Sequence, residues 1–244
     1  MKNLNFGYNS HFSIQNLSFK VEEESVYALL GNNGSGKTTL LRLLVGLLKP
    51  GSGEIKIFDE IMTRNKNQHW NIRQQIGILF QSPDDLLFAP TIEEDIAFGA
   101  RNLGLDEGEV KKRVEWALNA VDLIDYRNQS PFNLSWGQKK RASLAGLLVM
   151  KPKLLLLDEP FANLDFKSIY GYLEVLEKLR KEQHITILFT THELFFVENW
   201  ADFMLVIDNG KKIFEGDING GLNNLEVKKI IGSYDDIKKL IQKK

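Results

Sequence analysis

Gly31-Asn32-Asn33-Gly34-Ser35-Gly36-Lys37-Thr38 is the stretch that decides the fold, because it matches the phosphate-loop pattern G-x-x-x-x-G-K-[ST]. Residues 25–30 (SVYALL) predict a buried strand that enters the loop, and residues 39–48 (TLLRLLVGLL) predict a buried helix that leaves it. An accidental match in a glycine-rich turn is the alternative, and the flanking strand and helix argue against it.

The residue types of this loop suit phosphate binding. Glycines let backbone N–H groups approach phosphate oxygens, and the helix N-terminus adds the positive end of its dipole. We expect Lys37 to reach the β- and γ-phosphates and the Thr38 hydroxyl to hold Mg²⁺. The predicted nucleotide-binding positions of this segment are Asn32, Asn33, Gly34, Ser35, Gly36, Lys37, Thr38 and Thr39.

The composition limits what the chain can be. Its 244 residues, 43% of them apolar, suffice for one large domain or a domain with a subdomain. A net charge of −1 gives no basic field for nucleic acid, and the lack of cysteine excludes disulfides and thiolate metal sites. No run approaches the ~18–20 apolar residues of a membrane span, and residues 1–10 lack the apolar core of a signal peptide. We therefore expect a soluble protein that reaches a membrane only through a partner.

Short strands are predicted on both sides of the loop. Within residues 1–30, apolar residues alternate with polar ones between Asn/Ser/Gly clusters, which indicates an antiparallel sheet with one solvated face. Tyr8 in this region is a candidate for stacking on an adenine ring, and packing on the sheet is an equally good alternative. Further strands are predicted at residues 54–58 (EIKIF) and 75–80 (QIGILF), the second of which leads to Gln81.

Residues 82–150 contain mainly helical patterns. Asp106 and Glu109 predict a helix start, because apolar residues at helical spacing follow them. Residues 135–138 (SWGQ) open another helix, which is predicted to run to Met150. A serine and a glycine at a helix start are compatible with an anion site, but the residues alone favour an ordinary N-cap. We interpret residues 82–150 as a helical subdomain inserted into an α/β core.

Two acids follow the most apolar segment of the chain. Residues 154–157 (LLLL) predict a central parallel strand, and ligands of doubly wound sheets bind at the carboxyl ends of such strands. Asp158 is therefore a candidate Mg²⁺ ligand and Glu159 a candidate general base, with a polar loop as the alternative. His192, just past another predicted strand at residues 185–189 (ITILF), is a candidate contact of the γ-phosphate, with a structural histidine as the alternative.

The last part of the chain predicts a hairpin and a basic tail. Residues 203–207 and 211–214 are apolar segments that flank Asp208-Asn209-Gly210, a turn signal. Residues 217–244 predict polar turns and a basic terminal helix.

With the phosphate loop, Gln81, residues 135–138, Asp158-Glu159 and His192 in this order, the chain resembles the ATPase subunits of ABC transporters. The resemblance implies an α/β fold with a RecA-like P-loop core, an antiparallel β-subdomain and an inserted α-helical subdomain. It covers residues 1–216 as the ATPase domain and leaves residues 217–244 as a short C-terminal extension.

The resemblance also implies roles for the matching residues. Tyr8 matches the adenine-stacking aromatic, and Gln81 matches the residue that senses Mg²⁺ and the γ-phosphate. Glu159 matches the catalytic glutamate, and His192 matches the switch histidine. The signature segment, which contacts the γ-phosphate bound by the opposite subunit, corresponds to Leu134, Ser135, Trp136, Gly137 and Gln138. The family pattern implies two head-to-tail subunits that sandwich two ATP molecules.

Trp136 departs from the usual signature of this family, LSGGQ, in which a glycine stands at this position. Ser135 and Gly137 remain. A tryptophan excludes glycine-only backbone conformations here, and we still expect the site to work.

Residues 81–105 (QSPDDLLFAPTIEEDIAFGARNLGL) look like those of the energy-coupling-factor importers of cobalt, nickel and vitamins. This resemblance implies an ATPase at the cytoplasmic face of the cell membrane that powers uptake of a transition-metal ion or vitamin. The implied partners are a transmembrane coupling protein, a substrate-binding membrane protein and a second, identical or related, ATPase subunit. The alternatives are the ATPase of a conventional ABC transporter and, although no nucleic acid is expected, a nucleic-acid or translation ABC ATPase.

Overall fold

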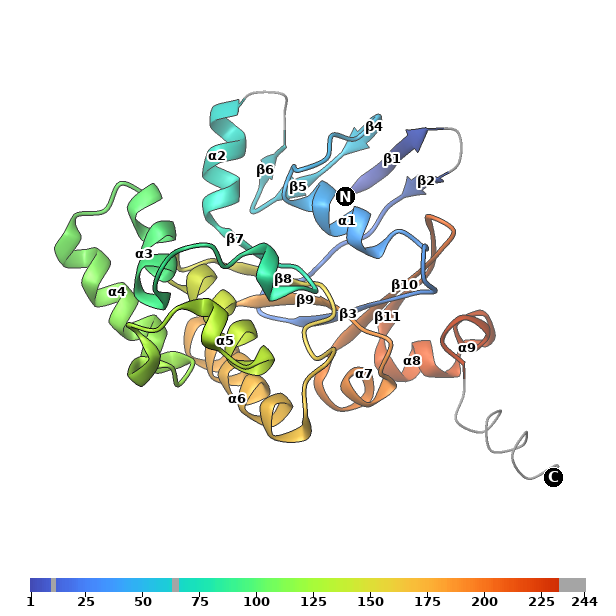
Figure 1. Ribbon diagram of the computed structural model, residues 1–244. Helices are drawn as coiled ribbons and strands as arrows, with labels where there is room; N and C mark the ends of the chain where they lie inside the picture. The colour runs from blue at the N-terminus through green and yellow to red at the C-terminus, as the bar shows by residue number, and fades with distance from the viewer. Residues whose placement is uncertain (10–11, 63–65, 233–244) are drawn as a thin grey trace, which may run out of the picture. The chain divides into compact units, whose positions relative to one another are not determined.

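The computed structural model describes residues 1–9, 12–62 and 66–232 (Figure 1). Its contacts divide the chain into two compact units. The first unit takes in the described parts of residues 1–62 and 188–244, and the second takes in those of residues 63–187. Part of the basic tail predicted at residues 217–244 lies outside the described residues, because these end at Gly232.

The antiparallel sheet predicted near the start of the chain is confirmed in the first unit. Strands β1 (Lys2–Asn9), β2 (Phe12–Leu17) and β4 (Ser52–Glu54) form it in the order β2-β1-β4. The single strand predicted at residues 54–58 is wrong. That segment divides between β4 and β5 (Lys56–Ile57), which pairs with β6 (Glu60–Ile61) in a separate hairpin.

The buried strand that enters the phosphate loop is β3 (Val26–Leu30), and all five of its residues are buried. It runs parallel to β10 (Phe203–Asp208), with Val206 opposite Leu30, and β10 pairs antiparallel with β11 (Lys211–Asp217). Because the register is parallel, β3 and β10 both end at the same edge. The helix after the loop, α1 (Lys37–Leu44), ends four residues before its predicted end.

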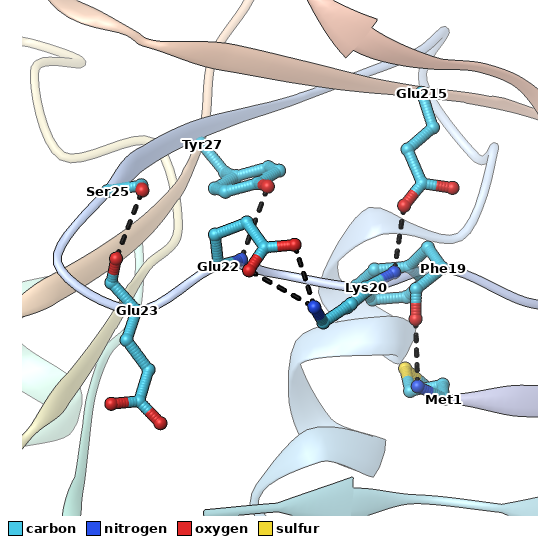
Figure 2. Close-up of polar contacts among 8 residues, drawn as sticks. All are labelled: Met1, Phe19, Lys20, Glu22, Glu23, Ser25, Tyr27 and Glu215. Atoms are coloured by element: carbon cyan, nitrogen blue, oxygen red, sulfur yellow. Dashed lines mark hydrogen bonds and ion pairs between the residues drawn. The ribbon is translucent and has the colours of Figure 1, made fainter.

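The connection from β2 to β3 is held by polar contacts within the first unit (Figure 2). The Met1 ammonium donates to the Phe19 carbonyl at 2.8 Å, and the Lys20 N–H donates to the Glu215 carboxylate on β11 at 2.8 Å. The Glu22 N–H donates to the Tyr27 hydroxyl at 3.2 Å. These bonds tie the β1–β2 sheet to the start of β3, the strand that carries the phosphate loop.

The second unit combines two parallel strands with a group of helices. Strands β7 (Ile76–Leu79) and β8 (Leu154–Leu157) confirm the strands predicted from the two apolar runs, and they pair in parallel with Leu79 opposite Leu157. Helices α3, α4 and α5 pack on one another, and α6 packs on α5 (Figure 1). The helices of this unit are α2 (Lys66–Gln74), α3 (Ile92–Asn102), α4 (Glu107–Ala120), α5 (Trp136–Leu148) and α6 (Phe166–Gln183).

Strand β9 (Thr186–Thr190) crosses the division between the units, which falls between Ile187 and Leu188. The strand order is β11-β10-β3-β9 in the first unit and β9-β8-β7 in the second. The remaining helices of the first unit are α7 (Leu194–Trp200), α8 (Ile218–Asn223) and α9 (Leu225–Ile231). Most of the described part of residues 217–244 forms the short helices α8 and α9. Helix α8 packs on β11.

Candidate functional site

The phosphate loop follows β3 in a conformation that glycine makes possible. A Cβ atom at Gly31 would lie 2.2 Å from the Ile207 carbonyl oxygen and 2.5 Å from the Ser35 hydroxyl oxygen. Gly34 and Gly36 have φ values of 78° and 109°, in the region that side chains disfavour. The loop pattern predicted from the sequence therefore corresponds to real backbone requirements at these positions.

Lys37 begins α1 and is held inside the loop. Its side chain is only 8% exposed, and its ammonium donates to the carbonyl oxygens of Gly31 at 2.8 Å and Asn32 at 3.2 Å. The preceding residue, Gly36, is the N-cap of α1 and forms no side-chain cap. A fixed ammonium beside a helix N-terminus is suited to an anion.

The turn between β10 and β11 braces the phosphate loop, which sequence reasoning did not predict. The Gly210 N–H donates to the Ser35 carbonyl at 3.0 Å, and the Asn32 amide donates to the Asp208 carboxylate at 3.4 Å. The Gln15 N–H of β2 donates to the Gly210 carbonyl at 3.0 Å. The Asp-Asn-Gly signal predicted the hairpin, but it carried no information on what the turn would contact.

The other predicted nucleotide contacts of the first unit lie on or beside these elements. Thr38 and Thr39 are half-buried in the first turn of α1. Tyr8 of β1 is 45% exposed and meets Phe6 edge-on, with ring centroids 4.8 Å apart. His192 is exposed between β9 and α7. The adenine-stacking role of Tyr8 and the γ-phosphate contact of His192 stay predictions.

In the second unit, the structure brings Gln81, Asp158 and Glu159 to one edge. Gln81 follows β7 and Asp158 follows β8, and the Asp158 N–H extends the parallel ladder by donating to the Leu79 carbonyl at 2.8 Å. Asp158 is buried, Glu159 is half-buried and Gln81 is exposed. The expectation that both acids lie at the carboxyl end of a buried parallel strand is confirmed.

The signature segment starts α5 with a complete capping box. The Ser135 hydroxyl accepts from the Gln138 N–H at 3.3 Å, and the Gln138 side-chain oxygen accepts from the Ser135 N–H at 2.9 Å. The N-cap favoured by the residues alone is therefore confirmed. The phosphate contact implied for Ser135, Gly137 and Gln138 stays a prediction.

Trp136 and Gly137 differ in what their positions require. Trp136 is the first residue of α5, and it is not among the described non-glycine residues with positive φ. Its backbone therefore needs no glycine. A Cβ atom at Gly137 would lie 2.7 Å from the Ser168 hydroxyl oxygen and 3.1 Å from the Ser168 Cβ, so this glycine allows α5 to approach α6 closely.

Comparison with known proteins adds three kinds of similarity. A family model described as ABC transporter matches residues 14–162. The chain is 43% identical to the energy-coupling factor transporter ATP-binding protein EcfA of Carboxydothermus hydrogenoformans, over 89% of this chain and 80% of that protein. It is 40% identical to the EcfA of Methanothermobacter thermautotrophicus, over 88% of this chain and 70% of that protein.

Two solved structures are similar over most of the chain. One is cbiO1 of Clostridium perfringens, described as part of the ABC transporter complex cbiONQ, with a TM-score of 0.84, 34% identity and coverage of 99% of this chain and 97% of that one. The other is the ATP-binding cassette MJ0796, a dimer with bound ADP and Pi, with a TM-score of 0.79, 25% identity and coverage of 89% and 97%. Within the described residues, no helix has the length and apolarity to cross a membrane.

Proposed function

The chain belongs to the ABC transporter family, and on that premise we propose that it is the ATP-hydrolysing subunit of a membrane importer of the energy-coupling-factor type. The observation that carries the proposal is the phosphate loop, in which Lys37, the first residue of α1, is fixed on the carbonyls of Gly31 and Asn32. The RecA-like ABC ATPase fold and the similarity to two EcfA proteins support it.

ATP binds with its phosphates at the N-terminus of α1. Backbone N–H groups of the loop donate to phosphate oxygens, and the Lys37 ammonium neutralises charge on the β- and γ-phosphates. The residues within reach of the nucleotide are proposed to be Tyr8, Asn32, Asn33, Gly34, Ser35, Gly36, Lys37, Thr38 and Thr39.

Mg²⁺ is proposed to be held by the Thr38 hydroxyl, the Gln81 amide oxygen and the Asp158 carboxylate. All three are oxygen donors, which Mg²⁺ prefers, and this ion usually combines one or two carboxylates with substrate phosphates. The described residues contain no cluster of three or more His, Cys, Asp or Glu side chains that could hold a metal ion. When bound, Mg²⁺ supplies charge neutralisation on the phosphate oxygens.

Hydrolysis is an in-line attack of water on the γ-phosphorus. The new P–O bond forms from the water oxygen while the bond to the β–γ bridging oxygen breaks, which yields ADP and phosphate. The Glu159 carboxylate accepts the proton of the attacking water, and His192 and Gln81 orient the γ-phosphate and the water. Lys37 stabilises the charge on the departing ADP.

The active assembly contains two ATPase subunits and membrane proteins. Ser135, Gly137 and Gln138 contact the ATP bound by the opposite subunit, so each site needs residues of both subunits. A transmembrane coupling protein and a substrate-binding membrane protein anchor the ATPases at the cytoplasmic face of the membrane. The proposed ATPase domain spans residues 1–216, with a helical subdomain at about residues 82–150 and an extension at residues 217–244.

Steady-state ATP hydrolysis by the purified chain and by Glu159→Gln tests the enzymatic part. Because the substitution removes the proposed base, we expect kcat to fall by about 10²–10⁴-fold while ATP affinity stays within threefold. Because glutamine has nearly the shape of glutamate, a change in kcat reports the loss of the proposed base and not a change in packing. Equal turnover of the two proteins would contradict the assignment of Glu159 as the base.

Affinity purification from detergent-solubilised native membranes, with mass spectrometry of the bound proteins, tests the partners. Recovery of a transmembrane coupler with small membrane binding proteins is expected, and a second ATPase in the same sample would indicate a heterodimer. Recovery with a conventional permease pair would show that the chain is the ATPase of a conventional ABC transporter and not of an energy-coupling-factor importer. Recovery only with nucleic acid or ribosomes would overturn the transport function.

A further inference from the structure

Lys140 is a buried charge for which the proposed catalytic steps give no role. It lies in the second turn of α5, and its side chain is 1% exposed. Its ammonium donates to the Glu159 carbonyl at 3.0 Å and to the Pro160 carbonyl at 2.8 Å. Burial lowers the pKa of Lys140 to about 8. A buried ammonium is unfavourable unless its partners compensate, and here the compensation comes from the two carbonyls and from the negative charge of Glu159, which raises the pKa.

The two carbonyls belong to the turn that carries the proposed base. Glu159 has a φ of 49°, a left-handed conformation that residues other than glycine keep only where the surroundings hold it. The Glu159 carbonyl also accepts from the Ala162 N–H at 3.2 Å, which closes a turn with Pro160 at its second position. Lys140 therefore holds the backbone directly after Glu159, and this backbone sets where the Glu159 carboxylate points.

The same lysine connects this turn to the signature segment. Ser135 and Gln138 form the capped first turn of α5, and Lys140 follows on the same helix. A helix transmits a displacement of its first turn to its second, because intrahelical hydrogen bonds join them. The Lys140 side chain extends that connection to the Glu159 turn.

We propose that Lys140 is a positioning residue that fixes the Glu159 carboxylate for hydrolysis and couples it to the signature end of α5. The proposal rests on the proposed function, since it requires Glu159 to act as the base. It predicts that loss of the ammonium slows the chemical step without weakening ATP binding, because Lys140 is only 1% exposed and its ammonium donates to the Glu159 and Pro160 carbonyls. A lysine that only stabilised the fold would change the thermal midpoint and leave kcat unchanged.

Lys139 provides a matched control on the same helix. Its ammonium lies 2.7 Å from the Asp84 carboxylate, with which it forms an ion pair. The two lysines carry the same charge at adjacent positions of α5, but Lys140 donates to the turn after Asp158 whereas Lys139 pairs with Asp84. Lys139→Met changes the charge of α5 in the same way as Lys140→Met.

The experiment measures kcat, KM for ATP and the thermal midpoint for Lys140→Met, Lys140→Arg and Lys139→Met in the full chain. For Lys140→Met we expect kcat to fall at least tenfold with KM within twofold, because methionine fills the site without donating. Lys140→Arg keeps donors and a charge, so its kcat is expected to stay within threefold of wild type. The kcat of Lys139→Met is expected to stay within twofold of the wild-type value.

The outcomes separate this inference from the proposed function. A Lys140→Met protein with kcat within twofold of wild type, or an equal loss in Lys139→Met, would overturn the inference. Where Lys140→Met does not fold, Lys140→Gln decides: a threefold or larger fall in kcat at unchanged KM supports the proposal, and wild-type kcat overturns it. Wild-type protein without ATPase activity would overturn the proposed function, whereas activity lost in Glu159→Gln but kept in Lys140→Met overturns this inference alone.

Discussion

The N-termini of α1 and α5 differ in how their backbone groups are satisfied. Helix α1 starts after Gly36, which forms no side-chain cap, whereas α5 starts with a capping box in which Ser135 and Gln138 bond to each other's backbone N–H groups. Both helices start in segments that the family pattern connects with phosphate. Their sequences nevertheless give the two helix starts different hydrogen-bond arrangements.

The difference indicates two kinds of phosphate contact. At α1, a cap without a side chain and a fixed ammonium suit the helix end to the role proposed for it, binding the phosphates of the subunit's own nucleotide. At α5, the Ser135 hydroxyl accepts from the Gln138 N–H and keeps its own O–H as a donor, so the phosphate proposed to come from the opposite subunit would meet a helix start whose capping box is already complete. The glycines differ too: Gly36 supplies a positive φ, and Gly137 supplies space.

Among changes at the two helix starts, Lys37→Met is expected to have the largest effect, because it removes the charge at the α1 end. Bonds from an ammonium to charged phosphates contribute about 1.5–3 kcal/mol each, so the affinity for ATP should fall by on the order of 100-fold. Titration of a fluorescent ATP analogue measures this. Lys49→Met removes an exposed lysine of the same unit and should leave the affinity unchanged. Binding by Lys37→Met within threefold of wild type would break the distinction between the two helix ends.

Gly137→Ala is expected to have an intermediate effect, through packing of α5 on α6. The added Cβ would lie 2.7 Å from the Ser168 hydroxyl oxygen, and such overpacking costs about 1–3 kcal/mol of unfolding free energy. Chemical denaturation measures the loss. Gly146→Ala lies on the same helix with no heavy atom within 4 Å of the new Cβ, so it should stabilise the protein by up to about 1 kcal/mol. Equal changes in both variants would show that Gly137 is not required for space.

Local patterns predicted the parts of the site that a single segment encodes. The phosphate loop, the strand ending at Asp158 and the capped start of α5 were predicted because strand, turn and helix signals follow one another in the chain. The error at residues 54–58 arose because one apolar run serves two sheets. Strand β4 pairs with β1 and β5 pairs with β6, and positive φ values at Phe58 and Asp59 turn the chain between β5 and β6.

The contacts that support the site were not predictable from local patterns. The Asn32 amide meets Asp208, 176 residues away in the sequence, and Lys140 meets Pro160 across 20 residues. The sequence around Asn32 or Lys140 contains no pattern that indicates which distant residue each side chain contacts. The end of α1 did carry a signal: Gly46 has a φ of 68°, and the Leu47 N–H donates to the Arg42 carbonyl at 2.9 Å. This pattern is a helix C-terminus closed by a glycine, which the apolar residues after Gly46 concealed.

Trp136→Gly is expected to have the smallest effect, although it restores the usual signature. Trp136 begins a helix with an ordinary backbone, and its indole N–H is buried without a partner among the described residues. Removing the ring relieves an unsatisfied donor worth about 1–3 kcal/mol and loses apolar contacts and helix propensity of similar size. We therefore expect kcat within a few-fold of wild type.

Comparison with Trp136→Phe shows which property of the side chain matters. Phenylalanine keeps an aromatic ring but has no N–H group. It should therefore leave kcat unchanged, and it should raise the thermal midpoint if burying the indole N–H costs more than the wider indole ring gains by packing. A loss of two orders of magnitude in Trp136→Gly, with activity kept in Trp136→Phe, would show that the ring is integral to the signature. In that case the start of α5 would depend on a bulky side chain as well as on its capping box, and the contrast with the start of α1 would be greater than the backbone contacts indicate.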